Sequence, residues 1–339
     1  MLYLKNDYAE GAYPPILEAL ARTNLESTDG YGEDPHSKHA RALIRAQCAC
    51  PEAAVHFLSG GTQTNLCLIA HALLPYQAAI AADTGHICTH ETGAIEATGH
   101  KAIAMPGVDG KLTASLIEEA VLAHPNHHMV EPKLVYLSHP SELGTLYKKA
   151  ELKAIREVCS RYHLLLYLDG ARLASALAAE ENDLFLPDLA QLCDAFYIGG
   201  TKCGALFGEA LVIPNRRLAE GFLYTLKQRG ARLAKGRMLG IQFEVLMQGD
   251  TYQKLGEKAN QMAAILREGL REAGCPFLVE SPTNQLFPIL PDALIGQLQQ
   301  RYDFIIQQRT DESHQAVRFI TSWATREEDI REFLSELPA

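Results

Sequence analysis

Hydrophobic and polar residues alternate in blocks that predict helices and strands in turn along the first part of the chain. Apolar residues recur at helical spacing over 15–22, 37–48, 62–74 and 150–162. Short apolar runs at 54–58, 134–137 and 164–168 are bounded by polar or turn residues, as buried strands of a parallel sheet are. Because a strand, a helix and a strand follow one another between 134 and 168, we predict an α/β fold with a mostly parallel sheet.

The pattern changes after about residue 215. Long helical stretches are predicted over 215–228, 232–247 and 251–273. Short strands near 286–290, 303–307 and 316–320 follow, with helices at 292–301 and 326–335. We therefore predict a smaller C-terminal α+β domain. The division expected is an N-terminal arm over 1–14, a large domain over 15–248 and a small domain over 249–339.

Composition and charge exclude several classes of protein. The chain has 339 residues, 47% hydrophobic and 21% charged, which is ordinary for a globular protein and excludes a disordered one. The 41 acidic residues exceed the 31 basic ones, and no basic block is present, so neither nucleic acid nor a membrane surface is an expected partner. No apolar run reaches the length of about 18 residues that spans a bilayer, and the first residues do not read as a signal peptide. We expect a cytoplasmic protein with reduced, scattered cysteines and no metal site.

A glycine loop lies between the strand predicted at 54–58 and the following helix. It comprises Ser59, Gly60, Gly61 and Thr62. The start of a helix offers unpaired N–H groups and the positive end of a dipole, and glycines let an anion approach the backbone. This pattern indicates a phosphate site, although it is also compatible with an ordinary helix cap. It lacks the lysine of a P-loop and the glycine spacing of a dinucleotide site.

Asp169 ends a buried apolar strand and is followed by a small-residue turn and Arg172. The carboxyl ends of parallel strands are where α/β folds place ligands. A carboxylate at this place can hold a cation or a protonated ring nitrogen. The structural alternative is the N-cap of a helix.

Lys202 follows the apolar strand predicted at 195–198 and a pair of glycines. Desolvation in such a stretch lowers the pKa of a lysine and makes its amine available as a nucleophile or base. The alternative is a lysine whose ammonium group reaches solvent.

His86 and His90 stand beside Glu91 between two glycines. Their order differs from that of the helical zinc motif H-E-x-x-H, so a zinc site is disfavoured. A histidine ring that stacks on a flat cofactor is the better functional interpretation.

Together these residues match the needs of one cofactor. Pyridoxal 5'-phosphate (PLP) requires an anion site, a stacking partner, a carboxylate for its ring nitrogen and a lysine for its aldehyde. The chain supplies these in the order Gly60 to Thr62, His86, Asp169 and Lys202.

The chain resembles the low-specificity threonine aldolases, within the β-eliminating lyase group of fold-type-I PLP enzymes. The matching stretches are YGEDP (31–35), SGGTQTN (59–65), HICTHETGA (86–94), DGAR (169–172), TK (201–202) and VR (317–318). The resemblance implies the fold-type-I PLP-dependent transferase fold, with a large domain and a smaller C-terminal α+β domain. It also implies a homodimer or homotetramer with shared active sites.

The resemblance implies roles for individual residues in holding the cofactor. Lys202 would form the aldimine, Asp169 would pair with the ring nitrogen and His86 would stack on the ring. The phosphate would be held by Gly60, Gly61, Thr62 and Thr201. Arg229 and Arg237, from segment 227–237, would reach the phosphate of a neighbouring subunit.

The substrate residues implied by the resemblance are Arg172 and Arg318, which would bind the carboxylate of an amino acid, and Asn6, which stands where the family has a serine. Lys202, His86, Asp169 and Arg172 are the catalytic residues implied.

The implied reaction is cleavage of the Cα–Cβ bond of L-threonine, L-allo-threonine or a related β-hydroxy-α-amino acid to glycine and an aldehyde. Segment 138–144 and His90 depart from the family pattern, so β-elimination or racemisation on the same scaffold stays open. The base that accepts the β-hydroxyl proton could be His86, His90 or a water molecule. A PLP-binding protein without catalysis is disfavoured because both the lysine and the aspartate are present, and a nucleotide-binding protein because the glycine loop lacks a lysine.

Overall fold

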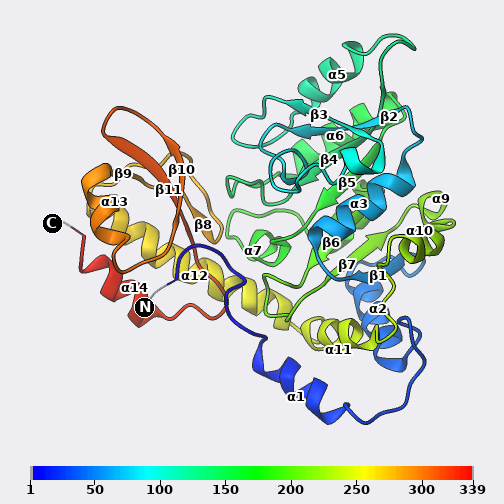
Figure 1. The fold of residues 1–339 in the computed structure, drawn as a ribbon, viewed down its shortest axis with the longest axis horizontal. Coiled ribbons are helices and arrows are strands. Elements are labelled where there is room, and N and C mark those ends of the chain that lie inside the picture. The colour runs from blue at the N-terminus through cyan, green and yellow to red at the C-terminus, as the bar shows by residue number, and fades with distance from the viewer. Residues whose placement is uncertain (1–2, 338–339) are drawn as a thin grey trace.

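A seven-stranded sheet forms the centre of the larger of two bodies in the computed structural model, which describes residues 3–337 (Figure 1). Its order in space is β1-β7-β6-β5-β4-β2-β3. The strands are β1 (Ala54–Leu58), β2 (Gln77–Ala82), β3 (Lys101–Met105), β4 (Glu131–Ser138), β5 (Leu165–Asp169), β6 (Ala195–Gly199) and β7 (Glu209–Ile213). Neighbouring strands are parallel except at β7, which is antiparallel to both β6 and β1. The predicted mostly parallel sheet is confirmed.

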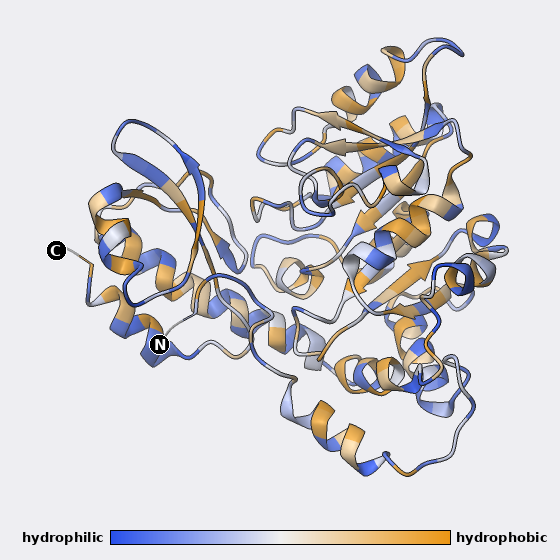
Figure 2. Cartoon of the chain, in the orientation of Figure 1, coloured by the Kyte–Doolittle hydropathy of each residue, from blue (hydrophilic) through white to orange (hydrophobic). Residues whose placement is uncertain are grey.

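Helices cover both faces of this sheet, and β2, β6 and β7 are correspondingly buried over their whole length and mostly apolar (Figure 2). Alternate residues of each strand enter two different cores, as in β4, where Val135 faces one core and Tyr136 the other. One core includes α1 (Pro14–Arg22), α2 (Pro35–Gln47), α5 (Ala114–Leu122), α6 (Lys149–Arg161), α7 (Leu173–Leu177), α8 (Leu186–Leu192) and α11 (Arg237–Leu246). The other includes α3 (Gly61–Ala72), α4 (His86–Thr89), α9 (Arg216–Ala219) and α10 (Phe222–Gln228), and a short 3₁₀ turn η1 (Glu96–Thr98) lies between α4 and β3.

The smaller body is built on a second, antiparallel sheet with the order β10-β11-β8, and β9 also pairs with β11. Its elements are β8 (Gln285–Leu286), β9 (Ile289–Pro291), α13 (Asp292–Leu298), β10 (Ile305–Arg309), β11 (His314–Ile320) and α14 (Glu327–Leu334). The long helix α12 (Thr251–Glu272) joins the two bodies (Figure 1). A Cβ on Gly256 of α12 would lie 2.3 Å from the carbonyl oxygen of Ala174, so glycine allows the close approach of α12 to α7.

The beginning of the chain is part of the smaller body. Leu4 is fully buried in its core, and its N–H donates to the carbonyl of Asp303 at 3.0 Å. The carbonyl of Leu4 accepts from the N–H of Ile320 at 2.9 Å. The chain then passes between the bodies and reaches α1 of the larger one (Figure 1). The division into 1–14, 15–248 and 249–339 stays a prediction.

The helices predicted over 215–228 and 232–247 are shorter than expected. The first is divided into α9 and α10, because Gly221 adopts a left-handed conformation with φ 72°. The second begins only at Arg237, after a turn whose Gly236 packs on the backbone of Gly32, where a Cβ would meet the nitrogen at 2.7 Å. The strand predicted at 286–290 is two short strands, β8 and β9.

None of the helices within residues 3–337 has the length and apolar character needed to cross a membrane. The cytoplasmic location stays a prediction.

Candidate active site

A cavity of about 510 Å³ lies at the carboxyl ends of β5 and β6, with walls from both bodies and from the N-terminal segment. The smaller body contributes Ile305 and Arg318, and the N-terminal segment contributes Tyr8. Most of the predicted site residues line this cavity, namely Gly60, Gly61, Thr62, His86, Asp169, Arg172, Thr201, Lys202 and Arg318. The fold therefore brings together residues that lie far apart in the sequence.

Lys202 follows β6 and lines the cavity. Burial lowers the pKa of its ammonium group, and the neighbouring positive charge of Arg172 lowers it further. A lysine in this environment gives up its proton more easily than one in water. Its amine is therefore suited to attack a carbonyl carbon.

Asp169 is the last residue of β5, and its side chain is held by four donors. One oxygen accepts from the hydroxyl of Tyr136 at 2.5 Å and from Asn65 Nδ2 at 3.1 Å. The other accepts from the hydroxyl of Tyr197 and from the N–H of Ala171 at 3.0 Å. The N-cap of α7 is Arg172, so Asp169 does not cap that helix. Four donors around a residue that is only 4% exposed use both of its oxygens as acceptors and fix the direction of the carboxyl group.

His86 is connected to Asp169 through two buried side chains. His86 Nδ1 lies 2.8 Å from Glu91 Oε1, and Asn65 Nδ2 donates to the same oxygen at 2.6 Å and to Asp169 at 3.1 Å. Burial alone would lower the pKa of His86, but the hydrogen bond to Glu91 and the charges of Glu142 and Asp169 raise it above its ordinary value. Glu91 therefore fixes the orientation of the His86 ring. Sequence analysis missed the roles of Asn65 and Glu91, although both lie within matching motif stretches.

The glycine loop forms the start of α3. Gly60 is the N-cap residue, and no side chain caps this end of the helix. A Cβ on Gly60 would find no atom within 4 Å, so open space lies beside the loop. The first N–H groups of a helix have no partner within it, and they carry the positive end of its dipole. This end of α3 can therefore receive an anion that enters the cavity.

Thr201 is bound to a carboxyl group that sequence analysis did not single out. Its hydroxyl donates to Glu209 Oε1 at 2.9 Å and accepts from the N–H of Gly208 at 2.9 Å. The second oxygen of Glu209 accepts from the N–H of Gly200 at 2.9 Å. Burial raises the pKa of Glu209 to about 7. Glu209 therefore fixes the backbone and side chain that precede Lys202.

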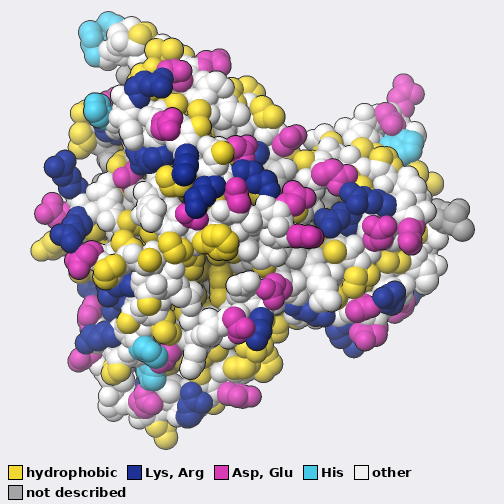
Figure 3. Space-filling model, turned by 180° about the vertical axis from the view of Figure 1, so that it is seen from behind, with side chains coloured by type: hydrophobic (Ala, Val, Ile, Leu, Met, Phe, Trp, Pro, Cys, Tyr) yellow, Lys and Arg dark blue, Asp and Glu magenta, His cyan; other side chains and the backbone are white. Residues whose placement is uncertain are grey.

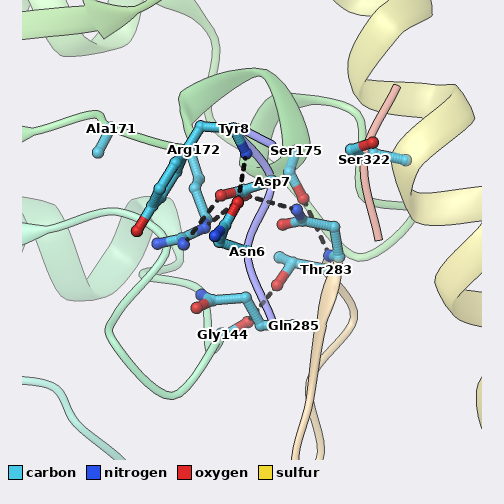
Figure 4. Close-up of polar contacts among 12 residues, drawn as sticks. Asn6, Asp7, Tyr8, Gly144, Ala171, Arg172, Ser175, Thr283, Gln285 and Ser322 are labelled. Carbon is cyan, nitrogen blue, oxygen red and sulfur yellow. Dashed lines mark hydrogen bonds and ion pairs between the residues drawn. The ribbon is translucent and has the colours of Figure 1, made fainter. Parts of the chain in front are cut away.

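Arg172 makes a two-pronged ion pair with Asp7 of the N-terminal segment (Figure 4). Arg172 Nε lies 2.7 Å from one carboxylate oxygen and Nη2 lies 3.1 Å from the other. Asp7 is 1% exposed and also accepts from Asn284 Nδ2 of the smaller body at 2.9 Å. Burial opposes ionisation of Asp7, but the charges of Arg172 and Lys202 and these hydrogen bonds hold its pKa below the usual range. Asp7 thus fixes Arg172 at the boundary between the bodies.

Arg318 lines the cavity from β11 of the smaller body. Its Nε is buried without a hydrogen-bond partner among the described residues. Two guanidinium groups therefore line one cavity, and one of them has an unused buried donor. A carboxylate is the group that guanidinium pairs bind best.

The comparisons with known proteins agree with this geometry. The family model described as β-eliminating lyase matches residues 7–293. This chain belongs to the β-eliminating lyase family. The family implies dependence on PLP.

Relatives of this family member include the low specificity L-threonine aldolase of Pseudomonas aeruginosa, which is 31% identical over 98% of this chain and 96% of the relative. The enzyme of the same name from Escherichia coli O157:H7 is 27% identical over 85% of this chain and 84% of its own. A solved structure described as Leishmania major threonine aldolase is 49% identical, with a TM-score of 0.97 over 98% of this chain and 97% of the other. The predicted family is confirmed.

Aspartate aminotransferase of Thermus thermophilus has the same fold, with a TM-score of 0.74 over 99% of this chain and 90% of the other. At 15% sequence identity, the two proteins share architecture only. The predicted fold-type-I architecture is confirmed.

Three predicted site residues of this β-eliminating lyase family member lie outside the lining of the cavity. Asn6 Oδ1 accepts from the N–H of Tyr8 at 3.0 Å, and this turn brings Tyr8 to the cavity. Arg237 donates to the backbone carbonyls of Glu26 and Asn24, each at 3.0 Å. Arg229 has a buried Nε without a partner among residues 3–337. The roles of all three stay predictions.

Proposed function

We propose that this protein is a PLP-dependent aldolase that cleaves the Cα–Cβ bond of a β-hydroxy-α-amino acid, of the L-threonine or L-allo-threonine type, to glycine and an aldehyde. The observation that carries the proposal is one cavity lined by Lys202, Asp169 and His86 together with two arginines. The relatives named threonine aldolase support it over elimination or racemisation, because they match nearly the whole chain.

The residues of the cavity fit PLP. The uncapped start of α3, with open space beside Gly60, suits a phosphate. Asp169 suits a protonated ring nitrogen, because four donors hold its charge in place. His86 is positioned by Glu91 and can stack on a ring. Thr201 would add a phosphate contact from the segment before Lys202.

When bound, PLP supplies an aldehyde for amines and a conjugated ring that accepts the electron pair released at Cα. Lys202 would provide the amine that attaches the cofactor to the protein, and its lowered pKa favours the neutral form of that amine. Asp169 holds the proton on the ring nitrogen, and each unit by which it raises the pKa of that nitrogen corresponds to about 1.4 kcal/mol.

Arg172 and Arg318 would bind the substrate carboxylate, with Asn6 and Tyr8 close to the same end of the cavity. Two guanidinium groups fix the direction of a carboxylate as well as its place. A fixed carboxylate determines which bond at Cα faces the cofactor ring, and so which bond breaks.

Asp7→Asn is expected to raise the KM for the amino acid about tenfold and to change kcat by less than about threefold, because Arg172 loses a charged partner that orients it. Steady-state kinetics separate the two constants. Asp303→Asn is a matched control. It removes an exposed ion pair between the smaller body and the N-terminal segment, in which Asp303 lies 3.4 Å from Lys5. An unchanged KM in Asp7→Asn would show that Asp7 does not position Arg172 for substrate.

We further propose a homodimer or homotetramer in which Arg229 and Arg237 reach the phosphate site of a neighbouring subunit. Hydrophobic side chains gather across the larger body in the view of Figure 3. Leu25, Leu223 and Tyr224 are among the exposed large hydrophobic residues of this body, at 93%, 46% and 84%. Exposed apolar side chains of this number favour contact with a second protein surface.

Arg229→Ala and Arg237→Ala are each expected to weaken PLP binding about tenfold, because each would remove one charged contact to the phosphate. Dialysis followed by measurement of the retained cofactor tests this. Arg216→Ala, which removes an exposed arginine paired with Glu52, should retain wild-type affinity. Wild-type retention in both test variants would contradict the shared site.

The experiment that tests the proposed function is product analysis. Purified, PLP-loaded protein is incubated with L-threonine, L-allo-threonine, phenylserine, L-serine and aromatic amino acids. Glycine with an aldehyde is the expected result. Keto acid with ammonia would replace the aldolase proposal by a β-eliminating lyase, and appearance of the opposite enantiomer would replace it by a racemase.

A further inference from the structure

Three carboxyl groups line the cavity, and they differ in how their oxygens are used. Both oxygens of Asp169 and both oxygens of Glu209 accept hydrogen bonds from the protein. Glu142 has one donor among residues 3–337, the hydroxyl of Ser138, which lies 3.2 Å from Oε1. The half-buried Glu142 lines the cavity, and no donor among the described residues binds its Oε2.

The segment that carries Glu142 is held firmly on both sides. The hydroxyls of Ser141 and Thr145 lie 2.7 Å apart, and Thr145 donates to the carbonyl of Asp109 at 2.8 Å. The carbonyl of Gly144 accepts from two buried hydroxyls of the smaller body, those of Ser281 and Thr283, each at 3.1 Å. A side chain on such a segment is positioned before substrate binds.

Glu142 also lies among the cationic groups of the cavity. Burial lowers the pKa of His90, Lys202 and Arg318. The negative charge of Glu142 opposes that fall at all three. Glu142 is therefore near the amine that attaches the cofactor and near an arginine proposed to bind the substrate carboxylate.

The two histidines of the cavity are less suited to accept a proton from substrate. His86 Nδ1 is already engaged by Glu91 at 2.8 Å, and burial is opposed by this hydrogen bond together with the charges of Glu142 and Asp169, which raise the pKa of the ring above its ordinary value. His90 has an exposed side chain, and no hydrogen bond to another described residue holds its ring. Its ring is tilted against that of His86 with centroids 5.5 Å apart. Glu142, in contrast, lies on a segment held by hydrogen bonds, and its Oε2 accepts no hydrogen bond from the described residues.

We propose that Glu142 is the general base that accepts the β-hydroxyl proton of the substrate, an inference that rests on the proposed aldolase function. The O–H bond breaks and its proton moves to Glu142 Oε2, while the oxygen forms a double bond to Cβ. The Cα–Cβ bond breaks, and its electron pair stays with the glycine fragment, where the bound cofactor accepts it. In the reverse reaction Glu142 returns the proton to the new hydroxyl.

The test compares two reactions of the PLP-loaded protein. Cleavage of L-threonine or L-allo-threonine needs a base for the β-hydroxyl group, whereas exchange of a glycine α-proton with deuterium does not. Glu142→Gln is expected to slow cleavage about 10²–10³-fold, within the range typical of a positioned base. Glycine exchange, glycine affinity and the absorbance of the bound cofactor should stay within about twofold of wild type. Glu280→Gln, in an exposed ion pair with Arg271, is the control.

Cleavage within about threefold of wild type in Glu142→Gln would overturn the assignment. An equal loss of cleavage and glycine exchange would also overturn it, because Glu142 would then act on the cofactor or the fold. Glu142→Ala provides a second test, since its lost cleavage should be partly restored by added formate. Failure of formate to restore cleavage in that variant would count against the proposal. If wild-type protein releases no aldehyde from any β-hydroxy amino acid, the proposed function itself fails, whatever the variants do.

Discussion

Lys202→Ala is expected to abolish the borohydride-reducible bond between protein and cofactor and to slow cleavage of β-hydroxy amino acids by at least about 10³-fold. The lysine lines the cavity beside Asp169 and the arginines, and burial lowers the pKa of its ammonium group. The variant loses both the point of attachment and an amine that can exchange protons with the substrate.

Mass spectrometry after borohydride reduction measures the attachment, and product formation measures the rate. Lys254→Ala, which removes an exposed lysine paired with Asp250, is the control and should behave as wild type. A reducible bond that persists in Lys202→Ala would place the attachment at another lysine.

Asp169→Asn is expected to slow cleavage by about 10²-fold or more, with little change in KM. The amide carries no charge to hold a proton on the cofactor ring. Its NH₂ group would also face donors, because the oxygens of Asp169 accept from Tyr136, Tyr197 and Asn65. A donor placed against donors loses hydrogen bonds that are worth about 1.5–3 kcal/mol each when the acceptor is charged.

The protonation state of the ring nitrogen, measured by NMR with ¹⁵N-labelled PLP, distinguishes this effect from a general loss of structure. The nitrogen should be protonated in wild type and neutral in Asp169→Asn at pH 7. Asp329→Asn, which removes the partner of the exposed Arg326, should leave both the rate and the nitrogen unchanged. A protonated nitrogen in Asp169→Asn would assign the charge compensation to a different group.

Features that depend on local sequence were predictable. They include Asp169 and Lys202, which are proposed to contact the cofactor directly. Asp169 and Lys202 each follow a buried apolar strand, and strands β5 and β6 are parallel neighbours, so their carboxyl ends meet at one edge of the sheet. The start of α3 was readable from Gly60 and Gly61, because glycines between a strand and a helix mark an exposed helix terminus.

Features that depend on distant contacts were not predictable from pattern. Asp7 meets Arg172 across 165 positions of sequence, and nothing near either residue indicates the other. Glu209 begins β7, whose apolar sequence resembles that of the neighbouring strands. This strand is nevertheless antiparallel to β6, and the carboxyl group of Glu209 accepts a hydrogen bond from Thr201. The network through Asn65 and Glu91 joins a helix to a turn, and only the packed fold shows that both side chains are buried. Side chains that depend on such distant contacts orient the reactive groups of the site.

Leu4 and Asp7 lie near residue 1 but are buried by residues near position 300, and this has a consequence for folding during synthesis on the ribosome. A nascent chain that has emerged to about residue 250 contains every strand of the seven-stranded sheet, and larger proteins fold region by region as they emerge. The hydrogen-bond partners of Leu4 and Asp7 include Asp303, Ile320 and Asn284, which are made later. Leu4 and Asp7 therefore cannot make these contacts until the segment 284–320 has been made. The capacity to bind an amino acid should arise in a single late event, after the sheet that carries the cofactor residues has already formed.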